Sequence, residues 1–266
     1  MMRIVWLTDI HLNFVPPHGL QRLYSDILRH EPDAILISGD IGESNSAAFY
    51  LNRLAKNTQR PIYFVLGNHD FYRGSLADVR DRIRAACAKS DNLIWLNEVD
   101  VIELTPTVGL VGHDSWADGR MGNYEQSEVV LNDYLLIDDF VHLNKAERLR
   151  RLHQLGDAAA DHVARVLPGA LARYPQVCLL THVPPFQEAC RHEGQPTDDA
   201  YLPHFGCQVV GEALREIMTA HPDRQLTVLC GHTHSAAQVS ILPNLHVRAA
   251  EIEYRKPRVE AVLTLE

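Results

Sequence analysis

Short clusters of oxygen- and nitrogen-bearing side chains recur along this chain in a fixed order. The clusters are Asp9-Ile10-His11, Gly39-Asp40, Gly67-Asn68-His69-Asp70, His182 and Gly231-His232-Thr233-His234. Carboxylate, amide and imidazole groups suit Mn²⁺, Fe²⁺/³⁺ or Zn²⁺, and no soft thiolate belongs to the set. Two such ions at one site activate water for attack on a phosphate ester. The side chains therefore predict a dinuclear metal centre that hydrolyses phosphate esters.

The spacing within two of the clusters favours a shared metal ion. Asp9 and His11 are two residues apart after an apolar run, and side chains at that spacing lie on the same side of an extended backbone. His232 and His234 repeat the arrangement. Either pair alone is weak evidence, because surface turns and structural histidines have the same appearance. The metal interpretation depends on all the clusters converging at strand ends.

The remaining clusters supply a bridge and a catalytic group. Asp40 has two carboxylate oxygens that can bridge two metal ions about 3.5–4 Å apart, although a helix N-cap explains it equally well in isolation. Asn68 adds a neutral amide oxygen, with a Gly-Asn turn as the alternative. His69 is the candidate acid or orienting group, and Asp70 is the candidate for fixing its tautomer, with divergence of the two adjacent side chains as the alternative. His182 ends a strand and is either a ligand or a satisfied core histidine.

Strands must carry these clusters to one place. Continuous apolar runs predict strands at 4–7, 35–37 and 62–66, which alternate with helices expected at about 20–30, 46–57 and 75–88. This order favours right-handed crossovers in an α/β layer fold. The runs at 93–96, 101–104 and 108–111 are typical of short antiparallel strands.

Strand patterns resume in the second half of the chain after a mainly helical region. We expect strands at 177–180, 226–229, 237–242, 246–250 and 259–263, and a helix near 207–220. One domain should span residues 1–266, with a mainly helical insertion at about 125–167. A long loop at about 184–206 is rich in proline and glycine, and long loops in compact domains are often functional.

Composition and charge narrow the function classes. The chain has 266 residues, 46% hydrophobic residues and a net charge of −9 without a Lys/Arg-rich block, so broad binding to nucleic acid is not favoured, though not excluded. No apolar stretch approaches the roughly 20 residues that a membrane span needs. The five cysteines form no CxxC pair, and the N-terminus runs straight into the first cluster. We therefore predict a cytoplasmic protein with free thiols and no membrane association.

The ordered clusters resemble the motifs of the calcineurin-like metallophosphoesterases. That family's set DxH, GD, GNH(D/E), H and GHxH matches positions 9 to 234. The resemblance implies a four-layer α/β/β/α fold, in which two mixed sheets are flanked by helices and the metals lie at strand C-termini. The implied ligands of the first metal are Asp9, His11, Asp40 and His234, and those of the second are Asp40, Asn68, His182 and His232. The resemblance also implies that His69 lies near the leaving group.

Other candidate residues lie beside or outside the motifs. Glu43 stands where the family commonly has a second aspartate, and its role stays open. The segment 112–120 is a candidate substrate region, in which His113, Asp114 and Arg120 would contact the substrate, with an ordinary polar loop as the alternative. Four aromatic residues are candidates for stacking on the leaving group, with loop packing as the alternative: Tyr72, Phe186, Tyr201 and Phe205.

These observations predict a metal-dependent phosphoesterase. A metal-activated hydroxide would attack a phosphate mono- or diester of a small molecule, and His69 would protonate or stabilise the leaving oxygen. The alternatives are a nuclease of the same fold, a protein phosphatase and a non-catalytic scaffold. Protein phosphatases normally have GNHE where this chain has GNHD, and scaffold relatives usually lose ligands that this chain retains. No oligomeric state is predicted, because one chain does not reveal its interfaces.

Overall fold

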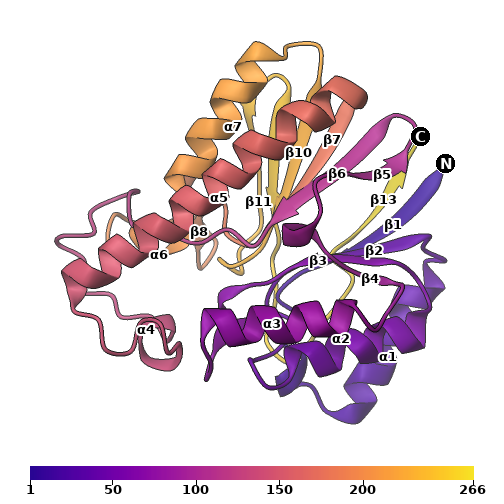
Figure 1. Ribbon diagram of the computed structural model, residues 1–266, viewed down its shortest axis with the longest axis horizontal. Helices are drawn as coiled ribbons and strands as arrows, with labels where there is room; N and C mark the ends of the chain where they lie inside the picture. The colour runs from indigo at the N-terminus through magenta and orange to yellow at the C-terminus, as the bar shows by residue number, and fades with distance from the viewer.

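The computed structural model describes residues 1–266 and contains two large facing sheets (Figure 1). The first sheet has the strand order β13-β1-β2-β3-β4, and β1 to β4 run parallel while β13 is antiparallel to β1. Its strands are β1 (Met2–Leu7), β2 (Ala34–Ser38), β3 (Ile62–Val65), β4 (Leu93–Trp95) and β13 (Ala261–Leu265). Because β1 and β13 pair, the two ends of the chain lie side by side.

The second sheet has the strand order β11-β12-β10-β7-β6-β5. The four central strands run parallel, whereas β11 and β5 at the two edges are antiparallel to their neighbours. Its strands are β5 (Ile102–Thr105), β6 (Val108–His113), β7 (Gln176–Thr181), β10 (Gln225–Cys230), β11 (Ala237–Leu242) and β12 (Leu245–Ala249). Both sheets are therefore mixed.

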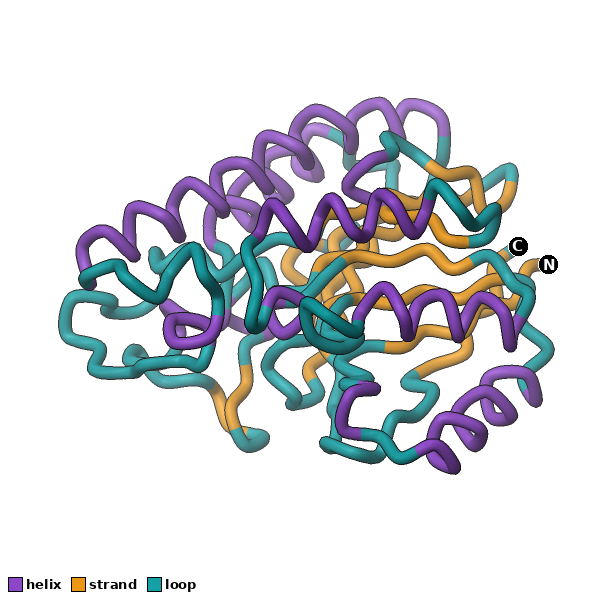
Figure 2. The backbone as a smooth tube through the Cα atoms, turned by 60° about the horizontal axis from the view of Figure 1, so that its bottom comes forward, coloured by secondary structure: helices purple, strands orange, loops and turns teal.

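Helices cover the outer face of each sheet (Figures 1 and 2). The first sheet is covered by α1 (Pro17–Arg29), α2 (Ala47–Thr58) and α3 (Leu76–Cys87), and the second by α5 (Lys145–Arg173) and α7 (Gln208–Ala220). The remaining helices are α4 (Asp133–Leu136) and α6 (Leu202–Phe205), and β8 (Arg191–His192) and β9 (Gln195–Pro196) form a short hairpin. Four 3-10 turns complete the structure: η1 (Leu12–Phe14), η2 (Asn68–Phe71), η3 (Leu96–Glu98) and η4 (Gln187–Ala189).

The two sheets and the helices on their outer faces form four layers. Alternating side chains of the strands build the three apolar cores between these layers. In β1, Val5 and Leu7 pack with α1 to α3, whereas Ile4 and Trp6 pack between the two sheets. A third layer joins the second sheet to α5 and α7. Strands buried on both faces need continuous apolar runs, which is the pattern seen at 4–7, 35–37 and 62–66. The predicted α/β/β/α architecture with two mixed sheets is confirmed.

Two expected segments differ in detail. The strand β4 is parallel to β3 and belongs to the first sheet, while only β5 and β6 form the expected antiparallel pair. Residues 125–132 contain no helix, and the long helix α5 begins at Lys145 and continues to Arg173 despite Pro168 in its interior. The side chain of Asn144 caps α5 by accepting from the backbone N–H of Glu147, and this local signal sets where the helix begins.

Candidate metal centre

The predicted ligand residues follow the C-terminal ends of five strands. Asp9 and His11 come after β1, Asp40 after β2 and Asn68 after β3, whereas His182 follows β7 and the pair His232 and His234 follows β10. Parallel strands present their carboxyl ends at one edge of a sheet, and open α/β sheets bind ligands there. Because the two sheets face each other with these edges together, the seven side chains converge.

The ligand loops hold an unusual backbone conformation. Asp9, His11, Asp40, His232 and His234 all have positive φ angles, between 39° and 69°. Non-glycine residues rarely adopt this region, and such strain is retained where the surrounding structure enforces it, often at functional sites. The loops after β1, β2 and β10 therefore turn sharply at the residues whose side chains enter the site.

Four side chains form a first buried group. One ligand atom from each of Asp9, His11, Asp40 and His234 lies within 4.8 Å of the other three. Nε2 of His234 is 3.1 Å from Oδ1 of Asp9 and 3.4 Å from Nε2 of His11. Nε2 of His11 is 3.7 Å from Oδ2 of Asp40. Two carboxylates and two imidazoles at these separations match the donor set of a metal ion.

A second group forms around the amide oxygen of Asn68. This Oδ1 lies 2.9 Å from Nε2 of His182 and 3.0 Å from Nδ1 of His232. The other nitrogen of each ring faces a backbone carbonyl, that of Ser38 for His182 and that of His204 for His232. Those carbonyls accept the ring protons, so the nitrogens that face Asn68 carry lone pairs. Three acceptors facing one another need a cation between them, and Oδ1 of Asp40, 3.5 Å from Nε2 of His182, completes the set.

Burial favours the ligating form of the imidazoles. It lowers the pKa of His11 to about 3 and the pKa of His232 to about 4, and it also lowers the pKa of His182. These rings are therefore neutral near pH 7. Burial, and then the negative charge of Asp9, raise the pKa of Asp40 well above its usual range. Two carboxylates close together in a buried site repel each other, and bound cations would remove that repulsion.

The match to known sequences covers most of the chain. The family model of calcineurin-like phosphoesterases matches residues 2–236, which include all seven predicted ligands. The chain belongs to the calcineurin-like phosphoesterases. Members of this family are hydrolases of phosphate esters, and the buried His/Asp cluster of this phosphoesterase fits their metal-binding character. A search of curated proteins gave no match.

Solved structures share the fold of this phosphoesterase at low sequence identity. Phosphopantetheinyl hydrolase from Mycobacterium tuberculosis is 14% identical with a TM-score of 0.68, over 95% of this chain and 90% of that one. A dimetal phosphatase from Danio rerio is also 14% identical, with a TM-score of 0.57 over 94% of this chain and 87% of that one. Likenesses at this identity establish the four-layer fold.

None of the helices combines the length and the apolarity that crossing a bilayer requires.

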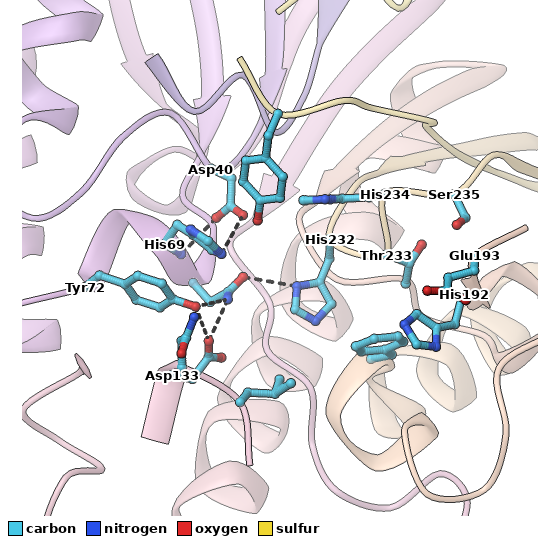
Figure 3. Close-up of a pocket in the computed structure, with 15 residues that line it drawn as sticks. Asp40, His69, Tyr72, Asp133, His192, Glu193, His232, Thr233, His234 and Ser235 are labelled. Carbon is cyan, nitrogen blue, oxygen red and sulfur yellow. Dashed lines mark hydrogen bonds and ion pairs between the residues drawn. The ribbon is translucent and has the colours of Figure 1, made fainter. Parts of the chain in front are cut away.

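The two predicted catalytic residues of the phosphoesterase occupy different surroundings. His69 lines a pocket of about 410 Å³ beside the candidate ligands, its Nε2 lies 4.0 Å from Oδ2 of Asp40, and its ring stacks on Tyr72 (Figure 3). Asp70 is completely buried, and its carboxylate accepts from the backbone N–H groups of Ile41, Gly42 and Gly67. The expected contact between Asp70 and the His69 ring is absent. Asp70 instead fixes the loops that carry Asp40 and Asn68.

The three predicted substrate contacts lie away from this pocket. His113 packs against His162 behind the site, and Oδ1 of the buried Asp114 accepts from Nε1 of Trp95. Arg120 forms ion pairs with Asp118 and Asp157. None of His113, Asp114 and Arg120 lines this pocket, and contact between these side chains and a substrate stays a prediction. Asp114 has a supporting part, because it also accepts from the N–H of Leu66 just before the Asn68 loop.

The predicted aromatic residues divide in the same way. Tyr72 and Phe205 line the pocket beside the metal ligands, whereas Phe186 is buried in the core beneath the second sheet. Tyr201 packs against the ring of His192. Glu43, whose role was open, forms an ion pair with Arg73.

Two residues at the site carry no sequence signal. Oδ1 of Asp133, in α4, accepts from the Asn68 amide at 2.7 Å and from the Tyr72 hydroxyl at 2.8 Å (Figure 3). Tyr254 lies between β12 and β13, beyond the family match, and its ring is 4.5 Å from that of His11. Neither residue belongs to a motif, and only the folded chain brings them to the candidate ligands.

Proposed function

We propose that this phosphoesterase binds two metal ions, Mn²⁺, Fe²⁺/³⁺ or Zn²⁺, and uses them to hydrolyse a phosphate mono- or diester of a small molecule. The observation that carries the proposal is the pair of inward-facing donor groups that share Asp40. One group consists of Asp9, His11 and His234 with Asp40, and the other consists of Asn68, His182 and His232 with the same carboxylate.

The ligand residues would set the position of the substrate. When bound, the two ions would lower the pKa of a water molecule and neutralise charge on the phosphoryl group. Asp40 would hold both ions at a fixed separation, because Oδ1 faces His182 and Oδ2 faces His11. The N–H of His69 also donates to Oδ1 of Asp40, which keeps this carboxylate from rotating.

His69 would act on the leaving group. Its ring lines the pocket, its Nε2 faces the edge of the metal site, and its Nδ1 is buried without a hydrogen-bond partner. Because the ring stacks on Tyr72 and Nε2 forms no hydrogen bond, this nitrogen would be free to donate to a substrate oxygen. We assign it to protonating the leaving oxygen or to stabilising the charge that develops there.

A paired hydrolysis assay tests the proposal. Protein reconstituted with Mn²⁺, Zn²⁺ or Fe²⁺ is given p-nitrophenyl phosphate and bis-p-nitrophenyl phosphate, and the ratio of the two rates separates monoester from diester preference. Metal-dependent turnover is expected, and its absence in every metal with two ions bound would overturn the proposal.

Metal counting tests the bridge independently of turnover. Asp40→Asn should lower the number of tightly bound ions below two, whereas the exposed control Asp138→Asn should retain both. An Asp40→Asn protein that still holds two ions would refute the shared ligand.

A further inference from the structure

A second cavity adjoins the pocket beside the metal ligands. It has a volume of about 380 Å³, and the two cavities share four lining residues: His69, Tyr72, Asn132 and Tyr254. We name this second cavity the arginine lobe, defined by Phe14, Glu43, Tyr72, Arg73, Tyr254 and Arg255. Because His69 borders both cavities, a group that left the phosphorus on the His69 side would have the arginine lobe open to it.

Aromatic rings form one part of the arginine lobe. Phe14 and Tyr254 are 41% and 44% exposed although each packs near His11, and their ring centroids are 5.9 Å apart. Large rings left open beside a polar site commonly serve ligand binding, since their faces stack on flat groups. Tyr72 adds a third ring on the other side of His69. The lobe therefore suits a leaving group with a flat ring.

Charged side chains form the other part of the arginine lobe. Arg73 is neutralised by its ion pair with Glu43. Arg255 has no acidic side chain within ion-pair distance, whereas its neighbours Lys256 and Arg258 pair with Glu253 and Glu260. Both lobe arginines have left-handed backbone, with φ of 62° for Arg73 and 67° for Arg255. One unpaired guanidinium matches one additional anionic group on the ligand, for which its planar donors are suited.

The side of the first pocket opposite the arginine lobe carries negative rather than positive charge. His192 and Glu193 of the β8–β9 hairpin line it, on the side of the pocket away from His69 and Tyr72 (Figure 3). A negative leaving group would be repelled by Glu193 and attracted by Arg255. The charge distribution therefore directs it into the arginine lobe.

From these observations, and resting on the metal centre of the proposed function, we propose that the arginine lobe binds the leaving group of a nucleoside diphosphate. The bond cleaved is then the terminal phosphoanhydride bond, a second bond class beside the phosphate esters proposed above. The ring of the base would stack on Phe14 and Tyr254, and the remaining phosphate would bind Arg255. In the reaction, the oxygen of water forms a bond to the terminal phosphorus and the bond from that phosphorus to the bridging oxygen breaks. The bridging oxygen keeps the electron pair and takes up a proton derived from water, which gives orthophosphate and a nucleoside monophosphate.

Three substrates, tested with the metal-reconstituted full chain, separate the contribution of a flat ring on the leaving group from that of its negative charge. ADP has a leaving group with both ring and charge, phenyl phosphate has the ring alone, and inorganic pyrophosphate has the charge alone. We expect kcat/KM for ADP to exceed the other two by at least about tenfold. An ADP value no higher than that of phenyl phosphate or pyrophosphate would overturn the proposal.

Substitutions of residues in the arginine lobe test whether the preference for ADP depends on this lobe. Arg255→Gln should lower the ADP-to-phenyl phosphate ratio of kcat/KM by about tenfold, because a charge-assisted contact is lost. Phe14→Leu keeps an apolar side chain without the flat ring and should lower the ADP-to-pyrophosphate ratio by about fivefold. Arg60→Gln is the control, since Arg60 is exposed next to the N-terminal end of β3, at the opposite edge of the sheet. Ratios in Arg255→Gln equal to those of the control would refute the charge assignment.

A binding measurement separates this proposal from the proposed function. AMP, the expected leaving group, is titrated calorimetrically into the same three proteins. Weaker AMP binding in Arg255→Gln than in Arg60→Gln supports the lobe even if no ester is hydrolysed, in which case only the proposed function fails. Equal AMP affinity in both proteins overturns the lobe, whatever the hydrolysis assay shows.

Discussion

The side-chain amide of Asn68 donates a hydrogen bond of 2.7 Å to Oδ1 of Asp133. An amide has one oxygen and one nitrogen, so a donated bond on the nitrogen decides where the oxygen points. Here the oxygen points at Nε2 of His182 and Nδ1 of His232. A residue of a four-residue helix thus sets the orientation of a candidate metal ligand 65 positions earlier in the chain.

Replacing Asp133 should weaken one metal site selectively. In Asp133→Ala the Asn68 amide loses its acceptor and can rotate its nitrogen toward the histidines, so affinity for the second ion should fall about 10–100-fold. Calorimetric titration of Mn²⁺ measures it, with the exposed Asp138→Ala as the matched control. Unchanged affinity for both ions would contradict the role that we give to Asp133.

His69 should act on turnover and not on metal retention. His69→Asn removes the ring at the pocket edge and keeps the backbone N–H that binds Asp40, so both ions should stay bound while kcat falls about 10²–10⁴-fold. Steady-state kinetics and metal analysis of the same sample provide the measurement. The exposed His18→Asn serves as control, and a metal-loaded His69→Asn protein with wild-type kcat would remove His69 from the mechanism.

Asp70 should act on stability through the ligand loops. Asp70→Ala leaves three buried N–H groups without acceptors and should lower the free energy of unfolding by more than about 3 kcal/mol. Asp70→Asn keeps an oxygen for Ile41 and Gly42 and should cost less. Urea unfolding of the two variants measures the difference, and two equal losses would show that these hydrogen bonds do not determine the effect.

His113 should make stability depend on pH below neutrality. Burial, and then the nearby His162 and Arg80, lower its pKa to about 3, against about 6.5 in the unfolded chain. The folded state therefore disfavours the protonated ring, and its contribution is complete above pH 6.5 and is lost as the pH falls toward 3. Between pH 7.5 and pH 5 the loss should be about 1–2 kcal/mol.

A neutral replacement isolates that contribution. In His113→Gln the fall in the free energy of unfolding between pH 7.5 and pH 5 should be smaller than in the wild type, because glutamine does not titrate. The same comparison with the exposed His18→Gln should show no difference. Parallel pH dependence in His113→Gln and the wild type would exclude His113 as the source.

The sequence predicts most of what local pattern controls. Buried strands require continuous apolar runs, so β1, β2 and β3 and the clusters that follow them could be placed, and parallel pairing then required convergence at one edge. The parallel position of β4 was missed, because a three-residue strand carries no sign of its partner. The start of α5 was also missed, although Asn144 and Glu147 form a capping pair that marks it.

Sequence-based prediction of the residues around the site is incomplete for a different reason. Asp133 and Tyr254 reach the metal ligands only through tertiary packing, and no residue near them in the sequence indicates a ligand. His113 and Asp114 have residue types suited to substrate binding, but neither lines the pocket beside the candidate ligands, and Asp114 accepts instead from Trp95 and Leu66. Residue type predicts chemistry, whereas the direction in which a strand end faces depends on the whole sheet.

The candidate ligands are divided between the two sheets. Asp9, Asp40 and Asn68 follow strands of the first sheet, while His182, His232 and His234 follow strands of the second. Each ion would therefore cross-link the two halves of the molecule in the manner of a removable staple, and part of its binding energy would become folding energy. The melting temperature should then rise with metal concentration. Chelation should weaken the interface between the two sheets before either sheet separates from its own helices.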